Sequence, residues 1–141
     1  MQNISYAQNA YRSIDIGSLS PLDLIIKLYD GAISFLSKAA LGIEKKDKIA
    51  KINYINKTRM ILEELLSSLN VEAGGEVALH LRDLYTYMIV ELTRANANNS
   101  IDKVYHVQEL MRTLKSAWQE IKITNTPVSE SYAIKSINSS H

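Results

Sequence analysis

The sequence predicts an all-α protein, an antiparallel up-down four-helix bundle. Apolar side chains recur every three, four or seven residues in four long stretches, and no stretch shows the alternation of a strand. The only two prolines, Pro21 and Pro127, lie before and after all four stretches. Connections of only about three to six residues between the stretches require consecutive helices to run antiparallel.

The first helix is expected from Ser20 to about Glu44. Ser20 suits the N-cap, Pro21 suits the first helical position, and Asp23 completes a pattern resembling a capping box. The charged run EKKDK then interrupts the apolar pattern. The stripe expected to face the core contains Leu22, Ile26, Tyr29, Ile33 and Leu36.

The second and third helices are expected over about residues 48–69 and 76–97. Between them, Gly74-Gly75 predicts a flexible break in the helical pattern. The apolar stripe of the second helix contains Ile52, Ile55, Leu62, Leu66 and Leu69. The stripe of the third helix contains Val77, Leu81, Leu84, Met88, Leu92 and Ala95.

The fourth helix is expected to follow Asn98-Asn99-Ser100, which ends one helix and caps the next, and to continue to about Lys122. Its stripe contains Val104, Val107, Met111, Leu114, Trp118 and Ile121. The four-helix bundle is thus assigned to residues 20–122. Residues 1–19 form a separate N-terminal segment, and residues 123–141, rich in Ser, Thr and Asn, are expected to be a disordered tail.

The composition limits the classes of function. A chain of 141 residues with 46% hydrophobic and 22% charged residues is typical of one soluble domain. Its formal net charge of +1 provides no strong field for nucleic acid or an anionic membrane. The absence of cysteine excludes disulfides, thiolate zinc sites and cysteine nucleophiles.

The N-terminus has neither the basic start nor the apolar run of a signal peptide. No stretch approaches the roughly 18 consecutive apolar residues of a membrane span. We therefore expect a cytoplasmic protein without direct membrane insertion and without a nucleic-acid partner.

No catalytic residues, cofactor or metal site are expected. His80, His106 and His141 are far apart in the sequence, and the chain has no Glu-x-x-His motif of the kind that di-iron bundles use. Gly74-Gly75 lacks the Lys and Ser/Thr of a phosphate-binding P-loop.

A histidine phosphotransfer domain is the enzyme-like alternative, because such domains are also helical bundles that expose one histidine. His80 is the candidate here. It is followed by Leu81-Arg82-Asp83 instead of the usual lysine and glycine, and the negative charge of Asp83 would repel a phosphoryl group. The sequence therefore disfavours this alternative.

Three of the helices carry more apolar side chains than a bundle core requires. The apolar arc of the first helix covers about 200°, twice the roughly 100° that faces a core. Contact with two neighbouring helices explains part of this excess, but its presence on three helices favours a groove that binds another protein. The predicted groove residues are Leu24, Leu28, Phe35, Tyr54, Ile61, Leu65, Leu79 and Val90. Tyr29, Tyr85 and Trp118 are expected in the core instead, with their polar atoms near the surface.

Several separated blocks also carry a family resemblance. They are a tyrosine ten residues before the Ser-Pro pair (Tyr11 to Pro21), SPLDLIIKLYDGAISFLSKA, INKTRMILEELLSSL, GGEVALHLRDLYTYMIVELTRANANN and LKSAWQEI. Together these blocks, over roughly residues 6–122, resemble the flagellin-specific export chaperones called FliS. The family often has two tyrosines close together near the N-terminus, whereas Tyr6 and Tyr11 are five residues apart, so only Tyr11 is assigned a role.

The resemblance implies a cytoplasmic, non-enzymatic bundle that binds the disordered C-terminal region of flagellin in apolar surface grooves. It implies that binding prevents premature polymerisation and delivers flagellin to the export apparatus. The export gate and other flagellar regulators or co-chaperones are further partners that it suggests. It also implies that the N-terminal segment acts as a lid over the groove, with Tyr11, Ile14 and Ile16 as the lid residues. The alternative function is a helix-binding regulatory or adaptor bundle for another flagellar protein.

Overall fold

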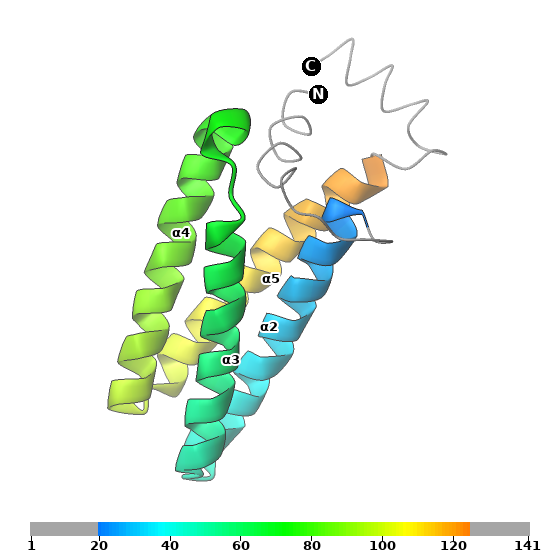
Figure 1. The fold of residues 1–141 in the computed structure, drawn as a ribbon. Helices are drawn as coiled ribbons and strands as arrows, with labels where there is room; N and C mark the ends of the chain where they lie inside the picture. Colours follow the sequence, from blue (N-terminus) through cyan, green and yellow to red (C-terminus); the bar gives the residue numbers. More distant parts are fainter. Residues whose placement is uncertain (1–19, 125–141) are drawn as a thin grey trace.

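The computed structural model describes residues 20–124, which form four helices (Figure 1). The helices are α2 (Pro21–Glu44), α3 (Lys48–Ser67), α4 (Val71–Asn98) and α5 (Ile101–Thr124). Each helix packs against the next one, and α5 packs against α2, so the predicted antiparallel bundle is confirmed for this part of the chain. The expected lid and residues 125–141 of the expected tail lie outside the described residues.

The helix starts follow local capping chemistry. Ser20 Oγ accepts a hydrogen bond from the Asp23 backbone N at 3.1 Å, and Pro21 occupies the first turn, as the sequence predicts. At the same end of the bundle, α5 continues to Thr124, so the first two residues of the predicted tail are helical.

The start of α4 differs from the prediction. Asn70 Oδ1 accepts a hydrogen bond from the Ala73 backbone N at 2.9 Å and caps a helical turn that begins at Val71, earlier than the expected Glu76. Gly75 then interrupts the helix with φ 57° and ψ −133°, a conformation that glycine adopts without steric cost. The glycine pair therefore makes a kink inside α4 rather than a loop before it.

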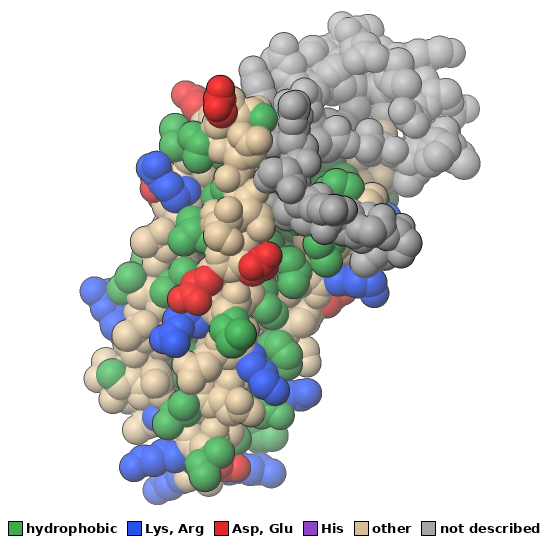
Figure 2. All heavy atoms as spheres, in the orientation of Figure 1, with side chains coloured by type: hydrophobic (Ala, Val, Ile, Leu, Met, Phe, Trp, Pro, Cys, Tyr) green, Lys and Arg blue, Asp and Glu red, His purple; other side chains and the backbone are tan. Residues whose placement is uncertain are grey.

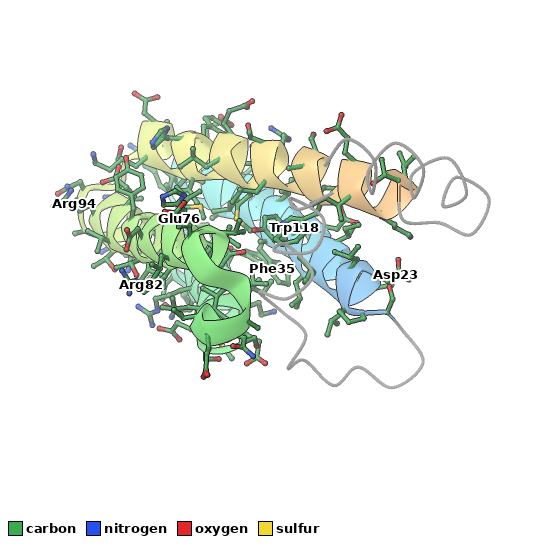
Figure 3. All side chains as sticks on the ribbon, turned by 90° about the horizontal axis from the view of Figure 1, so that it is seen from above. Asp23, Phe35, Glu76, Arg82, Arg94 and Trp118 are labelled. Carbon is green, nitrogen blue, oxygen red and sulfur yellow. The ribbon has the colours of Figure 1, made fainter. Side chains whose placement is uncertain are left out.

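A hydrogen bond between two buried tyrosines lies at the centre of the core. The hydroxyls of Tyr29 in α2 and Tyr85 in α4 are 2.6 Å apart, and neither residue is exposed to solvent. Burial, together with the neighbouring Tyr85, raises the pKa of Tyr29 well above its ordinary value. Trp118 of α5 is also buried and points into the bundle in Figure 3, so the predicted core positions of the three aromatics are confirmed. The two tyrosine hydroxyls, which were expected near the surface, lie inside the core instead, because each is the other's hydrogen-bond partner.

Helix α3 is turned about its axis relative to its predicted stripe. Ile52, which was expected in the core, is 42% exposed, and Lys51 and Thr58 are buried instead. Lys51 is accommodated because its Nζ donates to Asn96 O at 3.0 Å and to Asn99 Oδ1 at 2.7 Å, where α4 ends. The difference corresponds to a rotation of about 40° for a helix with 100° per residue.

Helix α2 shows a rotation of the same size. Ile25 is fully buried, whereas Ile26 and Ile33 of the predicted stripe are only half-buried. With α2 in this rotational orientation, one side of the helix packs against α5 and the opposite side packs against α3.

Polar contacts that recur every seven residues along α5 close the seam between α2 and α5. The partners are Gln108 with Ile33 and Ser37, Lys115 with Asp30, and Lys122 with Asp23. Gln108 is buried, and its Nε2 donates to Ile33 O at 2.9 Å and to Ser37 Oγ at 2.7 Å. The hydrogen bond from Lys122, with a second one from Ser20, holds the pKa of Asp23 below its ordinary value.

Helices α2 and α3 approach each other very closely beside their connection. A Cβ atom added to Gly42 would lie 2.8 Å from the backbone N of Lys51, closer than real Cβ atoms pack, and 3.1 Å from its Cα, a distance shorter than most Cβ contacts. At Gly31, by contrast, a Cβ atom would meet only Ile61 Cδ1, at an ordinary contact distance of 3.5 Å.

These two glycines provide a matched test of the packing. Gly42→Ala is expected to lower the free energy of unfolding by about 1–3 kcal/mol, because backbone atoms cannot move aside as a side chain can. Gly31→Ala is expected to raise it by up to about 1 kcal/mol, because alanine is the better residue inside a helix. Urea denaturation of both variants measures the difference, and equal effects would contradict the packing described at Gly42.

The tyrosine pair is tested by Tyr29→Phe. Removal of the buried hydrogen bond is expected to lower the free energy of unfolding by about 1–2 kcal/mol, whereas Tyr105→Phe, at an exposed tyrosine, should change it by less than about 0.5 kcal/mol. Urea denaturation at neutral pH gives both values.

The raised pKa of Tyr29 also predicts a pH dependence. The folded protein holds the Tyr29 proton more tightly than the unfolded chain does, so this contribution to stability is fully present below about pH 10 and is lost as the pH rises further. The wild-type protein should therefore lose stability more steeply above pH 10 than Tyr29→Phe. Parallel curves for the two proteins would argue against the assignment.

Candidate functional site

A shallow groove of about 380 Å³ lies on the seam between α2 and α3. It belongs to the face shown in Figure 2, where hydrophobic side chains lie among charged ones over these two helices. The lining residues are Leu28 and Phe35 from α2 and Lys57, Met60, Ile61 and Glu64 from α3.

The seven-residue spacing of the apolar side chains explains why they meet. Leu28 and Phe35 are two turns apart on α2, as Tyr54 and Ile61 are on α3, so antiparallel helices present the two pairs to each other. The rings of Phe35 and Tyr54 stack with centroids 5.9 Å apart and an interplanar angle of 29°. Gly31 lies between Leu28 and Phe35, and the space of its missing side chain faces Ile61.

Four of the eight predicted groove residues are thus gathered on one seam, namely Leu28, Phe35, Tyr54 and Ile61. All four are half-buried: Leu28, Tyr54 and Ile61 pack against the core, Phe35 stacks on Tyr54, and each keeps part of its surface exposed. Leu24 is also half-buried and lies one turn before Leu28 on the same side of α2.

The other predicted residues lie elsewhere. Leu65 was placed on the surface wrongly: its side chain is fully buried in the core, because the rotation of α3 turns it inward. Leu79 and Val90 belong to α4, which contributes no residue to the groove. Leu79 is half-buried and Val90 is exposed, so both keep accessible surface away from the α2–α3 seam.

Sequence reasoning missed Met60, the most exposed apolar side chain of the groove at 65%. The sequence offered one clue to Met60: it directly precedes Ile61, which was already predicted as a groove residue. Lys57 and Glu64 were also missed, since a search for apolar surface passes over charged residues.

Two lysines lie over the aromatic pair. Lys57 Nζ is 5.6 Å from the ring centroid of Phe35 and 5.4 Å from that of Tyr54, and Lys38 Nζ is 5.5 Å from the Tyr54 centroid. At these distances the negative face of each ring attracts the ammonium group. The groove therefore combines an apolar floor with positive charge at its Phe35 end.

A second hollow of about 400 Å³ lies at the connection of α2 and α3, beside Lys46, Lys48 and Lys51. Lys51 is held by Asn96 and Asn99 at the end of α4, so its buried charge already has a structural role. This hollow has no comparable run of accessible apolar side chains.

Other chemistry has little support in residues 20–124. His80 is exposed, as a phosphotransfer histidine requires, but the neighbouring Arg82 pairs with Asp83 at 3.2 Å and no further feature of such a site accompanies it. The Nε2 atom of His106 lies 3.0 Å from the Tyr87 hydroxyl. Within the described residues, no three His, Asp or Glu side chains are grouped as metal ligands, and no helix has the length and apolar character to span a membrane.

Comparison with known proteins identifies one family. The family model described as flagellar protein FliS matches residues 1–125. The flagellar secretion chaperone FliS of Campylobacter jejuni is 36% identical over 126 residues, which cover 89% of this chain and 98% of the relative. The protein of the same name from Salmonella typhimurium is 38% identical over 118 residues, with 83% and 87% of the two chains covered. The Bacillus subtilis protein is 28% identical over 111 residues, with 79% and 82% covered.

Proposed function

This chain belongs to the FliS family, and from that premise we propose that it is a cytoplasmic export chaperone whose client is flagellin. The bundle binds the disordered C-terminal region of flagellin, prevents its premature polymerisation and delivers it to the flagellar export apparatus. Binding requires no catalysis and no cofactor. The relatives bear the name of chaperones, a class of protein that acts by binding.

The groove on the α2–α3 seam is the observation that supports this function best. Leu28 and Phe35 present accessible apolar surface along about two turns of α2, and Met60 and Ile61 add apolar surface from α3. A groove between two helices matches the apolar face of a third, amphipathic helix. The C-terminal region of flagellin would supply that helix when it folds on the chaperone surface.

The expected energy is sufficient for a chaperone. Each apolar side chain that becomes fully desolvated contributes roughly 1.5–3 kcal/mol. Ordering the client segment costs about 2–5 kcal/mol, so five or six contacts near the upper end of the first range give a dissociation constant below about 1 μM. The groove alone supplies four of these contacts.

Further contacts are proposed outside the groove. Leu24 extends the apolar side of α2, and Leu79 and Val90 meet a client segment that continues around the bundle onto α4. In the empty state the N-terminal segment covers the groove as a lid through Tyr11, Ile14 and Ile16. The export gate and other flagellar regulators or co-chaperones remain proposed partners.

The groove is tested by Leu28→Asp and Met60→Asp. Each variant is expected to weaken binding of a flagellin C-terminal peptide by more than about tenfold, because a carboxylate in the groove opposes burial of the client's apolar face. Isothermal titration calorimetry measures the affinity. Ile49→Asp is the matched control, since Ile49 is 82% exposed and does not line the groove.

Circular dichroism and urea denaturation establish that each variant is folded. Met60→Asp is the more informative change, because Met60 is largely exposed and contributes little to the core. Unchanged affinity in both folded groove variants would remove the α2–α3 groove from the binding site. A wild-type protein that ignores flagellin but recovers another flagellar protein from lysate would favour the adaptor function instead.

A further inference from the structure

The groove has opposite charges at its two ends. Lys38 and Lys57 lie over the rings of Phe35 and Tyr54 at one end, and Glu64 lines the other end. Lys57 and Glu64 are seven residues apart on α3, which places their backbones about 10 Å apart along the helix axis. This distance corresponds to two turns of any helix that lies in the groove.

These charges form no ion pair within the described bundle. Asp23, Asp30 and Glu91 each form ion pairs with lysines of α5. In residues 20–124, by contrast, Lys38, Lys57 and Glu64 take part in none of the ion pairs. All three are exposed, so an arriving carboxylate or ammonium group reaches them without displacing a partner.

The two lysines are also held in place by what lies beneath them. Both ammonium groups lie over the ring of Tyr54, which belongs to α3 and stacks on the ring of Phe35 from α2. A lysine that packs its stem on apolar surface keeps its charge at the rim. The positive charge at this end of the groove is therefore supported by contacts that the bundle makes without a client.

We propose that this charge arrangement selects the chemistry and the direction of the client helix. This inference rests on the proposed function and specifies its occupant. The occupant is an amphipathic helix of the flagellin C-terminal region whose last turn carries a carboxylate that faces Lys38 and Lys57. The helix runs parallel to α2, with its N-terminal end toward Glu64.

Both parts of the proposal follow from the same electrostatics. The C-terminal end of a helix carries a partial negative charge and its N-terminal end a partial positive charge, so the lysines attract the former and Glu64 attracts the latter. A carboxylate in the last turn disfavours the helix in the free client. In the groove, the lysines neutralise this carboxylate, so that the segment becomes helical only when it is bound.

Charge selection is tested by Lys57→Glu with Arg82→Glu as the control. The two changes alter the net charge equally, but Arg82 belongs to α4, on the outside of the bundle in Figure 3. At low salt, Lys57→Glu is expected to weaken binding of a flagellin C-terminal peptide about tenfold, and Arg82→Glu by less than about twofold. The difference should shrink toward about 0.5 M salt, because added ions screen exposed charges.

Direction is tested with spin labels, for which the absence of native cysteine is an advantage. Asn53→Cys and Ser67→Cys place a label one turn beyond Lys57 and one turn beyond Glu64 on α3, at exposed positions that leave all three charges in place. Nuclear magnetic resonance of an isotopically labelled flagellin peptide reports which residues each label broadens. The residues broadened from position 53 should lie C-terminal to those broadened from position 67.

The outcomes separate this proposal from the function on which it rests. No binding of the peptide by the wild-type bundle would overturn the proposed function itself. Binding that depends on Met60 but not on Lys57 would leave the function intact and overturn charge selection. The reversed order of broadened residues would overturn the direction.

Discussion

The hydrogen bond between Tyr29 and Tyr85 is the constraint on which the arrangement of the bundle depends. Both side chains are fully buried, and a phenol hydroxyl in such a place requires a hydrogen-bond partner because no water reaches it. The bond joins α2 to α4, so it restricts rotation of either helix about its own axis. Once α2 is fixed in this way, the surface that it presents to each of its neighbours is fixed as well.

In this orientation, α2 meets α5 and α3 through two seams that differ in the kind of contact they contain. Toward α5, Asp23 and Asp30 pair with lysines, and the buried Gln108 bonds to the backbone and a hydroxyl of α2, so this seam is filled by satisfied polar contacts. Toward α3, Leu28 and Phe35 meet other apolar side chains whose surface is only partly covered. The seam that the bundle itself does not complete is the one to which we assign the client.

The sequence predicted the elements of the fold well because local chemistry determines them. The Ser20-Pro21 start and the helical spacing of apolar residues act within a few residues, and the structure follows both. The rotation of α3 was not predictable in this way. Lys51 and Thr58 occupy buried positions that an apolar stripe assigns to neighbours such as Ile52.

The same limitation explains the mixed result for the candidate site. Leu28, Phe35, Tyr54 and Ile61 come together because each pair repeats after seven residues, a regularity that is visible in the sequence. Leu65 shares the apolar character of these residues, but a rotation of about 40° moves it from the seam into the core. The role proposed for Lys57 and Glu64 depends on the position of the groove between them, which the sequence alone does not give.

The residues of the groove are also closer together in the sequence than the residues joined by two hydrogen bonds of the core. Its residues come from two consecutive helices, between Leu28 and Glu64, whereas the tyrosine bond joins residues 56 positions apart and the Gln108–Ile33 bond joins residues 75 apart. Contacts close in sequence lose less chain entropy on closure and form sooner. During synthesis, moreover, both walls of the groove leave the ribosome before α4 and α5 exist. The groove is therefore expected to form first, as a local helical hairpin, and the bond between Tyr29 and Tyr85 fixes its final rotation once α4 has been made.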